Sequence, residues 1–407
     1  MKYLCSHIIL EGREIPNRVL IHPMEGCDGT ASGSPDELTK RRYRRFSESG
    51  AGVIWLEATA VCFEGRANPR QLWLHENNVD DFKRLLDDVR ENSIRIFGYA
   101  PVIILQTTHS GRYSKPYGTP MPIVAYRRSA FEAGKEDLPY RIITDEECDA
   151  LPDAFGKSAL LAAQAGFDGV DVKCCHGYLL NEFLSAFDRP GRYGGSFENR
   201  TALYLSCIDS AKANITSEMF VTTRLNAYDG FAYPNGFGTD AMNAPDLNET
   251  KTLLGILQNR GIELVNVTLG NPYLIPHVNR PFVSGPEDGK IGVQRAIDIT
   301  GELQSAFPEL KMVLSTLSYP GINAVDVAEK CIAQNKCAFA GFGRMAFAYP
   351  QFYADYLKNG ELDKSKVCVK CGSCSKLMRA GTVAGCPVRD KEVYQPYYET
   401  YVGGKNA

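Results

Sequence analysis

Eight short apolar runs that alternate with amphipathic segments constrain the fold of this 407-residue chain more than any other feature of its sequence. A strand in a parallel sheet must be followed by a crossover, usually a helix, that returns the chain to the starting edge. Regular alternation of strands and helices therefore predicts an α/β protein with a parallel sheet. The expected strands are residues 18–23, 52–58, 102–107, 169–173, 220–225, 263–268, 311–316 and 338–343.

The segments between these strands show the apolar spacing of helices. Thr144 followed by Glu147 resembles a capping box, in which each side chain bonds the backbone N–H of the other residue. Pro245 stands where a first helical turn should open. The expected helices are residues 37–48, 79–91, 146–165, 199–213, 292–307, 324–334 and 349–358.

Spacing alone does not separate a closed barrel from an open, doubly wound sheet. Because no GxGxxG motif follows a strand and there are eight strand–helix units, we expect a (β/α)8 TIM barrel. Residues 8–15, with a turn at Glu11 and Gly12, are expected to form a hairpin before the barrel. A boundary near Gly360 divides the chain into a barrel, residues 1–360, and a C-terminal cysteine-containing segment, residues 361–407.

Three loops that follow strands are long, at residues 110–143, 226–244 and 270–290, and they are rich in Tyr, Pro and Gly. Active sites of such barrels lie in the loops after the strands. These loops are therefore expected to form the walls of a substrate pocket, although variable surface loops would show the same composition.

Charge and hydropathy exclude several classes of partner. A net charge of -3 argues against a nucleic-acid surface or an acidic-membrane patch. The first twenty residues contain no apolar run of signal-peptide length, and no 18-residue apolar stretch could span a bilayer. We therefore expect a cytoplasmic protein in a reducing compartment, where clustered cysteines bind metal more often than they form disulfides.

Four of the thirteen cysteines are clustered in a CxxCxxC run followed, after eleven residues, by Cys-Pro. Soft thiolates suit iron–sulfur clusters or zinc, and a three-cysteine run with a later Cys-Pro is how many iron–sulfur clusters are held. Zinc sites more often use two separated CxxC pairs, so a [4Fe–4S] cluster is preferred and zinc stays open. The predicted ligands are Cys368, Cys371, Cys374 and Cys386.

Several separated motifs, in order, resemble the old yellow enzyme family. The resemblance is to its iron–sulfur branch, which includes 2,4-dienoyl-CoA reductase, enoate reductase and trimethylamine dehydrogenase, and it covers about residues 6 to 390. The motifs are residues 17–25 (NRVLIHPME), 55–61 (WLEATAV), 105–112 (LQTTHSGR), 165–184 (AGFDGVDVKCCHGYLLNEFL), 221–226 (VTTRLN) and 341–350 (GFGRMAFAYP).

This resemblance implies an FMN cofactor in the barrel. Pro23 and Met24 would lie beside the isoalloxazine ring, the amide of Gln106 would bond its pyrimidine, and Arg224 would stabilise the reduced ring. Where the family has glycines at the phosphate, this chain has Ser315 and Thr316, whose hydroxyls are expected to act as donors instead. The remaining implied FMN contacts are Glu25, Ala58, Gly343 and Arg344.

The resemblance also implies a catalytic group after the fourth strand. Family members hold the substrate carbonyl oxygen with two groups there and donate a proton from a tyrosine two residues further on. The second group corresponds to His176 and the tyrosine to Tyr178, while Lys173 replaces the usual first histidine. A lysine and a histidine together can stabilise a developing oxyanion, and a phenol can protonate a carbon.

The predicted activity is reduction of an activated C=C bond, of enoate or enone type, by hydride from FMN. Oxidative amine demethylation on the same scaffold, or an electron-transfer subunit without its own substrate, stay as alternatives. The chain shows no counterpart of the FAD- and nucleotide-binding domains of its larger relatives, so NAD(P)H or an external electron-carrier protein is expected to supply electrons. Barrels of this family commonly associate, and a homo-oligomer is possible on that ground.

Overall fold

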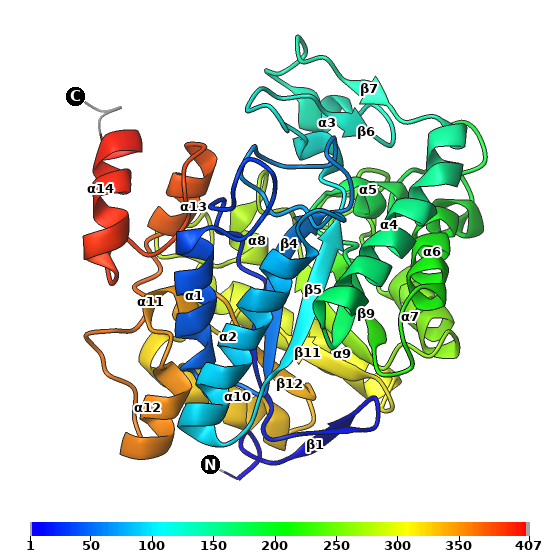
Figure 1. Ribbon diagram of the computed structural model, residues 1–407. Coiled ribbons are helices and arrows are strands. Elements are labelled where there is room, and N and C mark those ends of the chain that lie inside the picture. Colours follow the sequence, from blue (N-terminus) through cyan, green and yellow to red (C-terminus); the bar gives the residue numbers. More distant parts are fainter. Residues whose placement is uncertain (1, 404–407) are drawn as a thin grey trace.

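The computed structural model, described over residues 2–403, contains a closed barrel of parallel strands surrounded by helices (Figure 1). Around the barrel the strand order is β10–β11–β12–β3–β4–β5–β8–β9, and every neighbouring pair is parallel. The TIM-barrel prediction and all eight expected strands are confirmed. The strands are β3 (Val19–Ile21), β4 (Val53–Ala60), β5 (Val102–Thr108), β8 (Gly169–Val172), β9 (Phe220–Tyr228), β10 (Leu264–Leu269), β11 (Lys311–Leu314) and β12 (Phe339–Phe342).

The predicted N-terminal hairpin closes one end of the barrel. Strands β1 (Ile8–Leu10) and β2 (Arg13–Ile15) pair antiparallel across the Glu11–Gly12 turn. Leu10 and Ile15 are buried in one apolar cluster with inward residues of the barrel strands, including Trp55. This end of the barrel is therefore filled with packed side chains, and the chemistry is left to the opposite end.

Helices cover the outside of the barrel where the apolar spacing predicted them. The capping box of α4 is complete, since Thr144 accepts from the Glu147 N–H and Glu147 accepts from the Thr144 N–H. Pro245 lies ahead of α7, which begins at Asn248. The outer helices are α1 (Glu37–Ser47), α2 (Val79–Phe97), α4 (Asp145–Ala165), α6 (Phe197–Ala213), α7 (Asn248–Asn259), α9 (Gly289–Ala306), α10 (Ala324–Ala333) and α12 (Phe352–Asn359).

Two of the three long loops contain short elements that the sequence did not predict. In the first, β6 (Ile123–Val124) pairs with β7 (Arg141–Ile142), with α3 (Ser129–Glu132) between them, and together they stand above the barrel in Figure 1. The third contains α8 (Pro276–Asn279). Another short helix, α11 (Arg344–Ala348), begins directly after β12, and α5 (Leu179–Leu184) follows β8 after the turn of residues 173–178. These elements form walls around the open end.

The C-terminal segment packs against the barrel. Helices α13 (Ser373–Arg379) and α14 (Lys391–Tyr401) lie beside α1 in Figure 1. The Ala384 N–H donates to the Gly26 carbonyl at 2.7 Å, and Arg41 of α1 pairs with Asp390 at 2.7 Å. The proposed division at Gly360 stays a prediction, since the two parts share these contacts.

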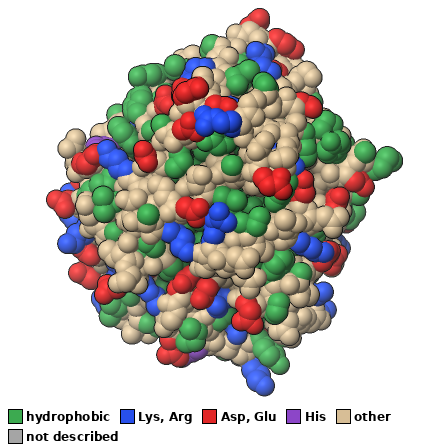
Figure 2. Space-filling view, turned by 90° about the vertical axis from the view of Figure 1, so that its right-hand side faces the viewer, with side chains coloured by type: hydrophobic (Ala, Val, Ile, Leu, Met, Phe, Trp, Pro, Cys, Tyr) green, Lys and Arg blue, Asp and Glu red, His purple; other side chains and the backbone are tan. Residues whose placement is uncertain are grey.

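The surface mixes charges of both signs. On the face shown in Figure 2, Lys and Arg side chains are interspersed with Asp and Glu, and hydrophobic side chains are scattered between them. That face lacks the continuous basic tract expected of a nucleic-acid-binding surface. Within residues 2–403, no helix is both long enough and apolar enough to span a membrane.

Candidate active site

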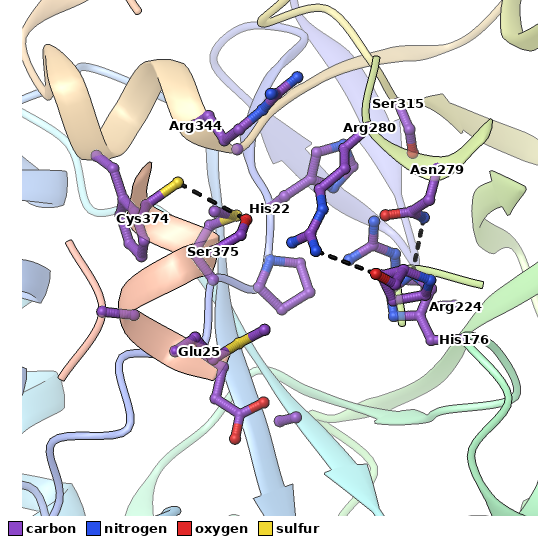
Figure 3. A pocket seen from close by; sticks show the side chains of 18 of the residues that line it. His22, Glu25, His176, Arg224, Asn279, Arg280, Ser315, Arg344, Cys374 and Ser375 are labelled. Carbon is purple, nitrogen blue, oxygen red and sulfur yellow. Dashed lines mark hydrogen bonds between the residues drawn. The ribbon is translucent and has the colours of Figure 1, made fainter. Parts of the chain in front are cut away.

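A large cavity lies at the carboxyl ends of the barrel strands and contains about 1010 Å³ of empty space, including its open mouth. All the residues predicted to contact FMN or to act in catalysis line it, as does one of the predicted cluster ligands, Cys374. Side chains from both walls point into it in Figure 3. The predicted residues are Pro23, Met24, Glu25, Ala58, Gln106, Lys173, His176, Tyr178, Arg224, Ser315, Thr316, Gly343 and Arg344.

The cavity holds more positive than negative charge. In the part of the chain that the structure describes, no carboxylate lies within 4.0 Å of Lys173, Arg224, Arg280 or Arg344 to form an ion pair. Burial lowers the pKa of Lys173 and of Arg224, and burial together with the neighbouring Arg344 lowers that of Arg280 to about 10. Buried charges need a counter-charge, so the cavity is built for an anion.

Glu25 is the carboxylate among the residues that line the cavity. Burial raises the pKa of this carboxyl, and the ammonium of Lys173 partly opposes that effect. Asn68 donates to Oε1 of Glu25 at 3.1 Å, which fixes the side chain at the edge of the cavity. One carboxylate does not balance the four cations around it.

Lys173 and His176 follow directly after β8 and face the same space. The Lys173 side chain is 4% exposed, and its Nζ lies 3.6 Å from the centre of the Tyr178 ring. His176 and Gly177 have φ angles of 68° and 71°. A left-handed conformation is uncommon outside glycine, and backbone strain of this kind concentrates at functional sites. The turn returns the chain so that Tyr178 also faces the cavity.

Three neighbours determine the protonation of His176. The amide nitrogen of Asn279 donates to the Leu269 carbonyl at 3.1 Å, and this acceptor-only partner fixes the orientation of the amide. The same nitrogen, which can only donate, lies 2.9 Å from Thr268 Oγ1 and 3.1 Å from His176 Nε2, and this places Nε2 as an acceptor (Figure 3). Burial and the cation of Arg224 lower the pKa of His176 well below its usual value. The ring is neutral with its proton on Nδ1, which makes Nδ1–H a hydrogen-bond donor.

Tyr178 belongs to a cluster of three tyrosines. Its hydroxyl lies 2.8 Å from that of Tyr273, and the Tyr273 ring stacks on Tyr113 with centroids 3.7 Å apart. Burial raises the pKa of Tyr178 well above its usual value, and the neighbouring Tyr273 adds to that effect. The phenol therefore keeps its proton until it has an acceptor.

Asp171 orients the predicted flavin contact Gln106. This buried carboxylate in β8 accepts from Gln106 Nε2 at 2.6 Å, from Trp55 Nε1 at 2.9 Å and from the Arg224 N–H at 2.7 Å. Since the amide nitrogen of Gln106 is held by Asp171, its oxygen is left as an acceptor on the cavity side. Burial raises the pKa of Asp171 to about 6.

At the opposite end of the cavity, the hydroxyls of Ser315 and Thr316 are not the free phosphate donors that the sequence predicted. The Ser315 hydroxyl donates to the Val267 carbonyl and the Thr316 hydroxyl to the Ser315 carbonyl, both at 2.6 Å. Both protons are engaged within the chain, so these hydroxyls are not free donors for a phosphate. Thr316 has a φ of 69°, which is strained for a β-branched residue. A Cβ on Gly343 would lie 2.8 Å from Met24 Sδ, so a larger residue there would require the Met24 side chain to move.

FMN fits this cavity on charge. The phosphate is anionic, and three guanidinium groups that lack carboxylate partners face the space. Arg224 is 8% exposed, and its Nε has no hydrogen-bond partner within residues 2–403. A polar ligand atom would satisfy this buried nitrogen.

The four predicted cluster cysteines lie in one segment, with Cys374 in the cavity wall. Burial, and more weakly the thiolates of Cys374 and Cys371, raise the pKa of Cys368. Four sulfurs around a single zinc ion lie roughly 3.8 Å apart, given a Zn–S distance of about 2.3 Å. Within the described residues, the four sulfurs do not form a group in which three or more lie within 4.8 Å of one another.

The described residues contain a compact group of side chains of metal-ligand type at another place in the fold. It consists of Cys62, Glu64 and His109, whose ligand atoms all lie within 4.8 Å. Gly111 N–H donates to His109 Nδ1 at 3.1 Å, so the neutral ring carries its proton on Nε2. Because neither ring nitrogen then offers a free lone pair, we do not assign a metal to this group.

Sequence reasoning missed several residues of the site. Asn279 and Arg280 lie in the third long loop, which was predicted only as a wall, and Tyr273 lies in the same loop. No motif identified them, although an arginine and tyrosines in a loop after a barrel strand are the residue types from which such pockets are built. Asp171 carried a clearer signal, because it is a charged residue inside an otherwise apolar strand.

Fold and site together define a flavin-dependent oxidoreductase barrel. The chain belongs to the NADH:flavin oxidoreductase / NADH oxidase family, whose family model matches residues 7–269. It is similar to an NADH:flavin oxidoreductase of Gibberella zeae, at 30% identity over 282 residues, covering 65% of this chain and 66% of that protein. Family membership supports FMN as the cofactor.

Two solved structures show the same fold over nearly the whole chain. One is 2-naphthoyl-CoA reductase in complex with 2-naphthoyl-CoA, with a TM-score of 0.78, 20% identity, and coverage of 97% of this chain and 58% of that chain. The other is histamine dehydrogenase from Rhizobium sp. 4-9, with a TM-score of 0.72, 17% identity, and coverage of 96% and 53%. This chain spans little more than half the length of either protein.

Proposed function

We propose that the protein reduces an activated C=C bond of an enoate or enone, with FMN in the large cavity and a [4Fe–4S] cluster beside it. One observation carries this proposal. Lys173, His176 and Tyr178, which all follow β8, line the same cavity as the residues predicted to bind FMN. Two hydrogen-bond donors and a protonated phenol are the groups that such a reduction requires.

FMN, when bound and reduced, supplies the hydride that goes to the β-carbon. Lys173 Nζ and His176 Nδ1–H are the donors that would hold the substrate carbonyl oxygen, on which negative charge develops. Because His176 is neutral and Lys173 is buried, both can donate without water competing for them. Holding that oxygen orients the double bond and polarises it.

Tyr178 is the proposed proton donor for the α-carbon. Its raised pKa means that it gives up the proton only to a strongly basic centre, such as the carbon of a developing enolate. Tyr273, 2.8 Å away, can return a proton to the phenolate oxygen. Tyr273 thus acts through Tyr178 and positions its hydroxyl.

The FMN contacts divide along the cavity. Arg224 and the oxygen of Gln106, from β9 and β5, are proposed to meet the polar edge of the flavin ring, beside Pro23, Met24 and Glu25, with the Ala58 backbone at the ring edge. Arg344 and the Cβ-free Gly343, at the end of β12, are proposed to meet the phosphate. Ser315 and Thr316 would then contribute backbone rather than hydroxyl donors.

Cys368, Cys371, Cys374 and Cys386 are proposed to hold the [4Fe–4S] cluster. A cluster of four irons is larger than one ion, so its thiolates stand further apart than those of a zinc site. Cys374 also lines the flavin cavity, so an electron from the cluster has a short path to the flavin. NAD(P)H or an external carrier protein would supply the electrons, and the proposed location is the cytoplasm.

Amine oxidation on the same scaffold is less well supported. Its substrate would be a cation seeking aromatic faces, and the Tyr178 face already carries the ammonium of Lys173 at 3.6 Å. A second cation would meet repulsion from Lys173 and from the unpaired arginines of the cavity.

Half-reactions measured without oxygen test this proposal. Chemically reduced protein mixed with cinnamaldehyde or cyclohexenone should regain the oxidised flavin spectrum, and histamine or trimethylamine should leave the oxidised protein unchanged. Tyr178→Phe should slow the reoxidation by about 10²–10⁴-fold and leave flavin reduction within about twofold. Reduction of the flavin by an amine, or an unaffected Tyr178→Phe protein, would contradict the assignment.

Metal and sulfide analysis of anaerobically purified protein tests the cluster separately. We expect about four iron and four sulfide per chain, as for a cubane on four thiolates. Cys371→Ala should lower the iron content, while Cys331→Ala, a buried cysteine of α10, should not. One zinc and no sulfide would refute the cluster and leave the ene-reductase assignment to be judged by its own assay.

A further inference from the structure

A second cavity, of about 1000 Å³ including its open part, adjoins the first one. Glu25 and Met378 line both cavities, so the two spaces meet at these side chains. The second cavity is enclosed by the loop that contains α3, by the loop after β10 and by α13. None of the residues proposed to hold FMN lines it, apart from Glu25 at the junction.

Cationic side chains outnumber carboxylates in the wall of the second cavity, to which Glu25 contributes one negative charge. Lys115, Lys135 and Arg379 line it, and none of them forms an ion pair with a carboxylate anywhere in residues 2–403. Arg379 donates to the backbone carbonyl of Pro272 at 2.8 Å. Arg112, in the same wall, is by contrast paired with Glu132 at 3.0 Å and with Glu182.

The rest of this cavity is largely apolar. Aromatic and aliphatic side chains from the α3 loop and from the loop after β10 form its walls, among them Phe131, Leu138, Tyr140, Tyr273 and Leu274. Apolar walls with a few unpaired cations are complementary to a molecule that has an apolar body and a negatively charged group. Tyr273 links the two spaces, since its hydroxyl contacts that of Tyr178.

We propose that the second cavity binds the remote part of the substrate, which is an apolar or aromatic body ending in an anionic group. The activated double bond would lie in the first cavity and the body would pass Glu25 and Met378 into the second. The anionic group would lie among Lys115, Lys135 and Arg379. Assignment of this molecule as the substrate rests on the proposed function, whereas binding of an amphipathic anion does not.

The test uses an isosteric pair of probes, 2-naphthylacetate and the neutral 2-naphthylacetamide, bound to oxidised, cofactor-loaded protein by equilibrium dialysis. Wild type should bind the anion more tightly than the amide. The triple variant Lys115→Gln/Lys135→Gln/Arg379→Gln should lose about tenfold in affinity for the anion and stay within about twofold for the amide, as expected for removing several part-exposed cations.

A matched control removes the same net charge elsewhere. Lys83, Lys330 and Lys358 line neither cavity, so Lys83→Gln/Lys330→Gln/Lys358→Gln should leave both affinities within about twofold. Leu138→Trp should fill the cavity and weaken both probes, and an unchanged flavin spectrum would show that these variants are folded. Equal affinities of wild type and the cavity variant for 2-naphthylacetate would overturn the proposal. Because dialysis involves no turnover, failure of the ene-reductase assay would be a distinct result.

Discussion

Buried arginines in two regions of this protein differ in whether a carboxylate balances their charge. Arg42, on α1, is 4% exposed and bonds both Asp28 and Glu57, which are themselves buried. Arg224 and Arg344 are each 8% exposed, and neither pairs with a carboxylate of the described residues. The charge of Arg42 is balanced by carboxylates of the chain, whereas the charges of Arg224 and Arg344 are available to an anion.

The difference coincides with position, since Arg224 and Arg344 line the cavity and Arg42 does not. Glu57 also accepts from the Gly26 N–H at 2.7 Å, so the Arg42 cluster fixes the loop that carries Pro23 and Met24. Buried charge without a partner destabilises a protein, and it persists where function requires it. We therefore expect substitutions in the two groups to act on different quantities.

Replacement of Arg42, which is paired with Asp28 and Glu57, should have the largest effect on stability. Arg42→Met leaves Asp28 and Glu57 buried without a counter-charge, and this should lower the free energy of unfolding by about 3–5 kcal/mol. Arg44→Met, which breaks an exposed pair with Asp88 at 2.9 Å, should cost at most about 1 kcal/mol. Urea unfolding of both variants measures the contrast, and similar losses would remove the distinction.

Asp171 extends the comparison to a carboxylate without a cationic side-chain partner. Its folded pKa of about 6 lies above its unfolded value of 3.8, so the folded state binds the proton more tightly. Below pH 4 this group contributes about 3 kcal/mol to the free energy of unfolding. That contribution declines as the pH rises to 6 and is lost above it. Asp171→Asn should flatten that part of the stability profile of the FMN-free protein. An unchanged profile would mean that another group carries the pH dependence.

Removal of an unpaired guanidinium should weaken FMN rather than the fold. Arg224→Met should raise the FMN dissociation constant by about 10–100-fold, as expected for the loss of a charge-assisted contact worth roughly 1.5–3 kcal/mol. Unfolding of the FMN-free protein should be unchanged or shifted to higher denaturant, since a buried charge is gone. FMN titration by fluorescence quenching and urea unfolding give the two quantities. A destabilised FMN-free variant would place Arg224 with Arg42.

Tyr273→Phe should have the smallest effect. It removes the hydroxyl that bonds Tyr178 and should slow flavin reoxidation by an enone about 3–10-fold, in line with one neutral hydrogen bond. Affinity for FMN should not change. The pH dependence of reoxidation should shift, because the environment of the Tyr178 proton has changed, and a purely structural role would leave it in place.

The fold was predictable because its signal is repeated. Each barrel strand is a short apolar run between helices, so errors at one boundary, such as residues 220–225 against Phe220–Tyr228, do not alter the topology. Short elements such as β6, β7 and α8 were not predicted, because two to four residues carry no periodicity. They are held by contacts to the rest of the structure.

The candidate site was predictable only where a motif marked it. Gln106, His176 and Tyr178 stand in motifs and all line the cavity. Asn279 and Arg280 stand in a loop without a motif, and their approach to His176 and to the cavity depends on a fold that joins residues about a hundred positions apart. The hydroxyls of Ser315 and Thr316 were expected to face a ligand, yet nearby carbonyls accept their protons. Local competition of this kind is not visible in a sequence.

The contacts of the C-terminal segment also determine when the site can form. Asp390 pairs with Arg41, Ala384 bonds Gly26, and Cys374 lines the cavity, so the wall joins residues more than 340 positions apart. The barrel itself closes between β12 and β3, which are similarly distant. During synthesis the first strands must therefore wait for residues near Asp390 before this wall of the cavity can form.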